Sequence, residues 1–301
     1  MSCDYTCNCA CTTEANAITT EHATISHQTF DGERALYGLR DAWVEDVIFA
    51  GPADGESVLK ECRNIDVERC EFDLRYPFWH TEGFSVSTSA LSESCRAALW
   101  YARDGRIDHT KLHGIKAVRE CDNITLEDCD VRSTEFGWKC RGLRILNSHL
   151  EGEYPFLDSR NVEMRDSELT GKYSFQYVEN LTIENSVLDT KDAFWHARNV
   201  VVRDSVIRGE YLGWYSEGLT LERCRIEGTQ PLCYAKNLTL IDCEMVGCDL
   251  AFENSEVEAS IRGHVDSIKN PRSGRIVVDS VGEVIREGAA HASNGEVLVR
   301  R

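Results

Sequence analysis

Five polar residues recur at a constant 19-residue spacing and supply groups suited to ligand hydrogen bonding or acid–base chemistry: Glu120, Lys139, Asp158, Tyr177 and His196. If successive repeats stack on one another, these side chains form a ladder with about 4.8 Å between neighbours. Charged groups beside flat rings suit a sugar chain, because hydroxyls accept and donate hydrogen bonds and pyranose CH faces pack on aromatic rings. The residues predicted to bind a ligand are Lys139, Asp158, Tyr177, His196, Tyr215, Tyr154 and Tyr173.

The same ladder contains the candidate catalytic residues Glu120, Lys139, Asp158 and His196. Glu120 and Asp158 lie two repeats apart, or about 9.6 Å, which is near the separation of about 6.5–9.5 Å found in inverting glycosidases. Any charged ladder at this spacing would give such a separation, so the pattern assigns no reaction. The Gly-His-Gly and paired-aspartate signatures of polygalacturonases are absent from the sequence.

The N-terminal segment is rich in cysteine. Cys3, Cys7, Cys9 and Cys11 fall within nine residues, and four thiolates could bind Zn²⁺ or a cuprous ion. Their spacing differs from that of a zinc ribbon, so the alternative is a reactive, flexible tail. We therefore separate residues 1–29, an N-terminal extension, from residues 30–301, which are predicted to form one domain.

The elements that must position the ladder follow from an internal repeat. Numbering each repeat from its first apolar residue, position 1 is Ile65, Phe84, Gly105, Ile124, Leu143, Val162, Leu181, Val200, Leu219 and Leu238. All steps are 19 residues except the step from Phe84 to Gly105, which is 21. Positions 3 and 8 are also apolar, and position 6 is always Ser, Thr or Cys. A fixed period of this size indicates a solenoid.

Each repeat is predicted to contain two short strands and a third segment, with corners between them. Positions 1 and 3 share one face of a strand and positions 6 and 8 share another, so the chain must bend at positions 4 and 5. The residue before position 1 is Asn, Gly or Asp throughout, the types that tolerate positive φ. A 19-residue coil with an asparagine corner fits a right-handed parallel β-helix better than solenoids with hexapeptide or pentapeptide periods.

The prediction is therefore an all-β, right-handed parallel β-helix of roughly ten 19-residue coils. Core coils are expected over about 46–265, with caps on both sides because open strand edges invite aggregation. In the third segment we place positions 12, 14 and 16 on the outside and position 15 inside. This assignment exposes Phe156, Phe175 and Phe194, and it also buries Arg119 and Gln176, which conflicts with their polarity.

Several long motifs resemble the bacterial family called domain of unknown function 3737: CRAALWY at Cys95–Tyr101, GIKAVREC at Gly114–Cys121, EFGWKCR at Glu135–Arg141, DAFWH at Asp192–His196, GTQPLCY at Gly228–Tyr234 and DSIKNP at Asp266–Pro271. The resemblance runs from about Phe30 to Ile285. It implies a pectin-lyase-like right-handed β-helix, and it brings no established activity and no catalytic residues.

The net charge of the chain bears on which classes of molecule it can bind. A formal net charge of −18 repels phosphate backbones and anionic lipids, so we expect no nucleic-acid or membrane partner. We see no secretion signal, so the 14 cysteines are interpreted as reduced thiols of a cytoplasmic protein, several of them buried at position 6.

Two functions remain. The first is carbohydrate recognition, with or without lyase or hydrolase activity on a polysaccharide. The alternative is a non-enzymatic scaffold or protein-interaction solenoid whose aromatic face binds a partner or forms a homo-oligomer.

Overall fold

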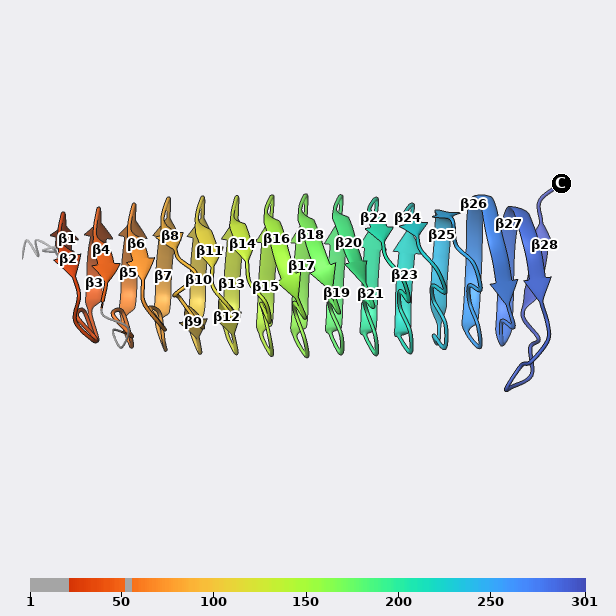
Figure 1. The fold of residues 1–301 in the computed structure, drawn as a ribbon, viewed down its shortest axis with the longest axis horizontal. Helices are drawn as coiled ribbons and strands as arrows, with labels where there is room; N and C mark the ends of the chain where they lie inside the picture. The colour runs from red at the N-terminus through yellow and green to blue at the C-terminus, as the bar shows by residue number, and fades with distance from the viewer. Residues whose placement is uncertain (1–21, 52–55) are drawn as a thin grey trace, which may run out of the picture.

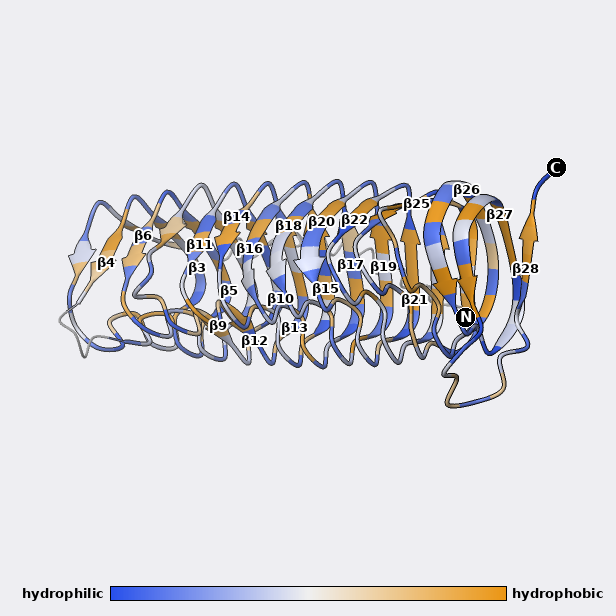
Figure 2. Ribbon diagram, turned by 45° about the vertical axis from the view of Figure 1, so that its right-hand side comes forward, coloured by the Kyte–Doolittle hydropathy of each residue, from blue (hydrophilic) through white to orange (hydrophobic). Residues whose placement is uncertain are grey.

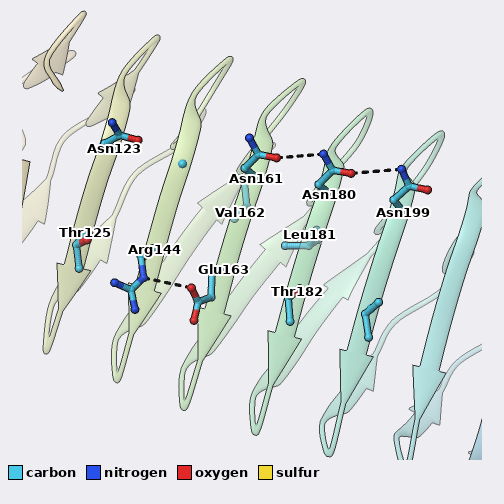
Figure 3. A pocket seen from close by; sticks show the side chains of 12 residues that line it. Asn123, Thr125, Arg144, Asn161, Val162, Glu163, Asn180, Leu181, Thr182 and Asn199 are labelled. Atoms are coloured by element: carbon cyan, nitrogen blue, oxygen red, sulfur yellow. Dashed lines mark hydrogen bonds and ion pairs between the residues drawn. The ribbon is translucent and has the colours of Figure 1, made fainter. Parts of the chain in front are cut away.

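The computed structural model describes residues 22–51 and 56–301, which form one long solenoid of stacked coils (Figure 1). The described residues contain strands and turns and no helix, so no helix there could cross a membrane. Strands nearest the viewer run downward in Figure 3 while successive coils advance to the right, so the coil is right-handed. The predicted fold class is confirmed, and all strand pairs are parallel.

Two rows of strands build the solenoid, and neighbours within a row belong to successive coils. The first row is β1 (Ala23–Ser26), β3 (Arg40–Glu45), β5 (Arg63–Glu68), β7 (Glu82–Ser87), β10 (Arg103–Asp108), β13 (Asp122–Glu127), β15 (Arg141–Leu146), β17 (Arg160–Arg165), β19 (Glu179–Glu184), β21 (Arg198–Arg203) and β23 (Glu217–Glu222). The second row is β2 (Thr29–Phe30), β4 (Ile48–Ala50), β6 (Glu71–Asp73), β8 (Ala90–Leu91), β11 (Lys111–His113), β14 (Asp130–Arg132), β16 (His149–Glu153), β18 (Glu168–Lys172), β20 (Val187–Lys191), β22 (Val206–Arg208) and β24 (Arg225–Glu227).

The two rows merge near the C-terminus, where single strands span the corner: β25 (Leu238–Val246), β26 (Glu256–Lys269), β27 (Ser273–Ile285) and β28 (Glu296–Val299). Bands of hydrophobic and hydrophilic residues alternate along β26 and β27 (Figure 2). A small third sheet pairs β9 (Leu99–Trp100) with β12 (Val118–Arg119).

The repeat positions take the places that their residue types predict. Positions 1, 3 and 8 are buried along the stack, as at Val162, Met164 and Leu169. The corners at position 5 and before position 1 are left-handed, with φ of 50° at Asp166 and 55° at Asn161. Asp and Asn are suited to these corners because their short polar side chains tolerate this conformation.

Position 6 is small and polar because it satisfies buried backbone groups between coils. The Ser186 hydroxyl accepts a hydrogen bond from the Ser167 N–H at 3.2 Å and donates to the Glu184 carbonyl at 2.8 Å. The thiol of Cys224 donates to the equivalent carbonyl of Glu222 at 3.4 Å. All ten described cysteines are buried and unpaired, and burial raises the pKa of Cys129 to about 11.

The stack is longer than the ten coils that the repeat reveals, with about fourteen turns. At the N-terminal end, Ala23 pairs with Ala42 and Ala42 pairs with Ile65, so β1 and β3 continue the register. The step from Ala42 to Ile65 is 23 residues, which hides it from a 19-residue search. At the other end β26, β27 and β28 also stack in parallel. Segments expected as caps are therefore further coils.

Candidate ligand-binding groove

We call the third segment of each coil (positions 12–16) the closing turn. It contains β9 and β12 in the Phe84 and Gly105 coils, and it is a turn without named strands from the Ile124 coil to the Leu219 coil. In those later coils positions 12, 14 and 16 all have positive φ, with values of 61°, 58° and 57° at Tyr173, Phe175 and Tyr177. Because these residues are not in a strand, their side chains do not alternate between faces as strand residues do. Phe156, Phe175 and Phe194 are fully buried, so the predicted outward facing of position 14 is wrong. Their rings stack at 4.7 and 5.3 Å between centroids.

Position 15 lies outside, which corrects the second half of that prediction. Trp195 and Trp214 are half-buried, and each indole N–H donates to the position-12 carbonyl of the next coil, at 2.8 Å in both cases. The Gln176 amide makes the equivalent contact with the Asp192 carbonyl at 3.4 Å. The position-15 column therefore covers the backbone of the turn, and the conflict over buried polar residues disappears.

Arg119 occupies the same outer column. Its guanidinium lies 5.5 Å from the Trp138 ring centroid and 6.0 Å from that of Trp100. It also forms ion pairs with Glu120 at 3.0 Å and Glu135 at 3.8 Å. An arginine between two indoles is stabilised by cation–π attraction, so its polarity is fully accommodated at the surface.

Position 16 forms the predicted ladder, with backbone hydrogen bonds linking each closing turn to the next from Glu120 through Lys139, Asp158 and Tyr177 to His196. From Tyr177 onward the ladder is aromatic. Ring centroids are separated by 4.9 Å for Tyr177–His196, 5.1 Å for His196–Tyr215 and 4.9 Å for Tyr215–Tyr234, with interplanar angles of 9°, 8° and 13°. We call Tyr177, His196, Tyr215 and Tyr234 the exposed aromatic column.

The other two predicted ligand residues, Tyr154 and Tyr173, lie at position 12 on the far side of the closing turn. Their rings stack on each other at 4.6 Å. Neither lines the groove described next, so the structure does not bring them together with the position-16 ladder. Positions 12 and 16 would share a face on a strand, as predicted, but in the closing turn they do not.

A groove runs beside the ladder, parallel to the solenoid axis. One wall is position 16 and the other is position 18, the residue before the asparagine corner. One section of about 490 Å³ is lined by the exposed aromatic column together with Asp158, Arg160, Val178, Glu179, Arg198, Ser216, Glu217 and Lys236. The adjoining section of about 450 Å³, which we call the central cleft, is lined by Tyr101, Glu120, Asp122, Lys139, Cys140, Arg141, Asp158 and Arg160.

Asp158 and Arg160 line both sections, so the groove is continuous. Sequence reasoning identified the position-16 wall and missed the position-18 wall. A signal was present, because position 18 is charged in every coil from Arg63 to Lys236. The charge pattern alone does not place position 18 opposite position 16, because that placement depends on the path of the turn between the two positions.

Stacking decides which ring faces a ligand can reach. Ring separations close to the coil spacing show that the rings stack along the solenoid axis, so faces inside the exposed aromatic column cover one another. The column ends at Tyr177, whose neighbour Asp158 is shorter and leaves the outer part of the ring uncovered. Tyr177 is accordingly 54% exposed, compared with 45% for Tyr215. A free tyrosine face therefore borders the central cleft.

Several charged side chains of the central cleft have no ion-pair partner and are available to a ligand. Among the described residues, no oppositely charged atom lies within 4.0 Å of the charged atoms of Lys139, Arg141 or Asp158. Glu120 differs. Partial burial raises its pKa, but hydrogen bonds of Arg119, Tyr101 and Trp100, together with the charge of Arg119, hold the pKa of Glu120 below its usual range. An ionised Glu120 is poorly suited to act as a general acid.

The predicted metal site cannot be placed, because Cys3, Cys7, Cys9 and Cys11 lie outside the described residues. Within residues 22–51 and 56–301, no group of three or more His, Cys, Asp or Glu side chains could hold a metal ion.

A second hollow of about 530 Å³ lies on the outer face of the first strand row, beside the asparagine corners (Figure 3). Asn180 donates to Asn161 at 3.0 Å and Asn199 donates to Asn180 at 3.3 Å, so the asparagine side chains bond from coil to coil. Arg144 and Glu163 pair across it at 3.2 Å. Because these groups satisfy one another, the groove at position 16 offers more to a ligand.

These features define a parallel β-helix with a lateral groove. The chain belongs to the DUF3737 family, described as a protein of unknown function, whose model matches residues 23–298. The predicted family is thereby confirmed. No curated protein matches the sequence.

Some solved structures are similar to this chain at low identity. PfbA, a surface adhesin of Streptococcus pneumoniae, is 8% identical over 86% of this chain and 70% of its own, with a TM-score of 0.34. The A-module of the Azotobacter vinelandii mannuronan C-5 epimerase AlgE6 is 9% identical over 93% and 91%, with a TM-score of 0.30. The catalytic domain of a GH87 alpha-1,3-glucanase is 12% identical over 92% and 63%, with a TM-score of 0.28. Likeness at this level carries no functional argument.

Proposed function

We propose that this protein binds a carbohydrate in the groove between positions 16 and 18, with its main contacts in the central cleft. The observation that supports the proposal is that a free ring face, at Tyr177, lies next to charged groups without ion-pair partners on both walls of the groove. A pyranose presents a CH face that packs on an aromatic ring and hydroxyls that bond to charged side chains. The cleft offers both kinds of contact within one or two coils.

The proposal is for binding, and it assigns no reaction. Catalysis would need a proton donor and a base at matched pKa values. The pKa of Glu120, one of the candidate acids, is lowered by its neighbours, which disfavours the protonated form that a general acid needs. The remaining candidates Lys139, Asp158 and His196 contact the ligand in this proposal. Product analysis after incubation with any bound glycan would test for turnover directly.

The test is a binding screen with matched variants. Purified protein is titrated calorimetrically with neutral oligosaccharides, uronates and amino sugars, and a ligand that binds is then titrated into Tyr177→Ala, Asp158→Ala and Tyr154→Ala. We expect the first two variants to lose at least fivefold in affinity. Tyr154→Ala removes an equally large ring on the far side of the closing turn, so it should bind as the wild type does.

The contrary outcomes are distinct. No binding to any class of glycan by folded protein would overturn the proposal. Equal losses in Tyr154→Ala and Tyr177→Ala would also overturn the assigned site. If the protein forms a defined oligomer that Tyr215→Glu dissociates, the exposed aromatic column is a protein contact and the scaffold alternative is favoured instead.

A further inference from the structure

One coil of the groove differs from the others in charge. In the Ile124 coil, position 16 is Lys139 and position 18 is Arg141, so both walls carry a cation. In every other coil from Ile65 to Leu219, at most one wall carries Lys or Arg. The Ile124 coil lies in the central cleft, next to the coil that contributes Asp158 and Arg160.

The charge pattern along the position-18 wall is also irregular at this coil. From Arg63 to Lys236 its charges alternate in sign between neighbouring coils, with one break where Arg141 lies directly opposite Arg160 in the strand register. Like charges directly opposite one another destabilise a sheet. Arg160 is compensated by Glu179 at 3.5 Å, whereas Arg141 has no carboxylate within 4.0 Å among the described residues.

An anion in the cleft would compensate this arrangement. Lys139 offers a compact ammonium group from one wall, and Arg141 offers a planar fork that matches carboxylate, sulfate or phosphate oxygens from the other. The two cations are unpaired although the chain as a whole carries a net charge of −18, so carboxylates for pairing are abundant elsewhere. Two cations without partners at facing positions of a groove favour a ligand that supplies the negative charge.

The neighbouring carboxylates restrict where that charge can lie. Glu120 and Asp122 belong to the coil before and Asp158 to the coil after, and all three line the cleft. An anionic group must therefore sit over the Ile124 coil itself, about 4.8 Å from either neighbouring coil. Asp122 and Asp158 are then placed to accept hydrogen bonds from ligand hydroxyls on the two flanking sugar units.

We propose that the carbohydrate bound in the groove carries an anionic substituent, seated between Lys139 and Arg141. This inference rests on the proposed function and specifies the class of glycan: an acidic chain, with carboxylate, sulfate or phosphate groups. The free face of Tyr177 then packs on a sugar one or two coils further along.

The experiment compares oligosaccharides of one backbone and length that are neutral, carboxylated, sulfated or phosphorylated. Each is titrated into the wild type, Lys139→Met, Arg141→Gln and Arg132→Gln at low and at high salt. Arg132 is the matched control, because it lies in the same Ile124 coil at an exposed position outside the groove. We expect one anionic form to bind at least tenfold more tightly than the neutral form, and this advantage to shrink at high salt.

The advantage should vanish in Lys139→Met and Arg141→Gln and persist in Arg132→Gln. Equal binding of neutral and anionic chains would overturn this inference while leaving carbohydrate binding intact. An anionic advantage that persists in Arg141→Gln and disappears in Arg132→Gln would also overturn it. Absence of binding by every chain would overturn both proposals together.

Discussion

Two columns of stacked aromatic rings run along the solenoid only two residues apart in each closing turn. The inner column at position 14 contains Phe156, Phe175 and Phe194, and the outer column at position 16 contains Tyr177, His196 and Tyr215. Ring separations are nearly equal in the two columns, yet the inner rings are fully buried and the outer tyrosines are about half exposed. The ring separation in both columns therefore follows from the coil spacing. Only solvent exposure distinguishes the inner column, which packs in the core, from the outer column, which a ligand can reach.

The comparison also shows where recognition can occur. Rings inside either column cover one another, so an exposed column presents edges and polar atoms along its length and a flat face only at its end. Tyr177, at that end, is the most exposed tyrosine of the column, at 54%, and it borders the central cleft. A ligand that packs on this ring face is therefore directed to the central cleft.

The largest expected effect separates the two columns by stability. Phe175→Ala should lower the free energy of unfolding by about 3–5 kcal/mol, because it removes a buried ring between two others. Tyr177→Ala should lower it by less than about 1 kcal/mol, because surface substitutions cost little. Chemical denaturation of both variants measures the difference, and equal losses would show that the outer column is structural in the same way as the inner one.

A second effect concerns the polar column inside the solenoid at position 6. Ser186→Ala leaves the buried N–H of Ser167 without its acceptor, which should cost about 1–3 kcal/mol of unfolding free energy. Ser186→Cys should cost less, because cysteine already occupies this position in other coils. If both variants unfold like the wild type, the hydroxyl column contributes nothing to coil stacking.

A third, smaller effect distinguishes the end of the outer column from its interior. For a glycan that binds, Tyr177→Ala should cost about 1 kcal/mol in binding free energy, or roughly fivefold in affinity, because the variant loses a free ring face. Tyr215→Ala should cost less than about threefold, because both faces of that ring are already covered. A larger loss for Tyr215→Ala than for Tyr177→Ala would contradict the argument from stacking.

The smallest effect tests a buried carboxyl in the same turns. Asp192 is 7% exposed, and burial raises its pKa, with a further contribution from Glu210 that Lys191 opposes. Because the folded-state pKa is raised, ionisation of Asp192 destabilises the fold as pH rises through that value. Asp192→Asn should therefore be slightly more stable than the wild type at neutral pH. The difference should disappear below pH 3.8, the ordinary carboxyl pKa, and thermal denaturation across pH measures it.

Much of the scaffold was predictable from local patterns. Asn123, Asn161 and similar corner residues predicted left-handed turns, and the apolar positions predicted the core, because each depends on one residue's conformational or burial preference. The ladder from Glu120 to His196 was predictable for the same reason, since a constant spacing places its members in neighbouring coils. The first coils escaped the repeat because the longer step from Ala42 to Ile65 breaks the period.

By itself, the sequence determined the parallel β-helix, its 19-residue period, its core positions and the order of residues along the ladder, because a repeat specifies neighbours whenever its coils stack. Only the tertiary structure decided which residues of the closing turn point outward, since alternating left-handed residues place Phe175 inside and Trp195 outside against the rule for strands. It also decided that position 18 forms the second wall of the groove and that Tyr177 keeps a free face. Those properties depend on the path of the turn and on how rings in separate coils cover each other.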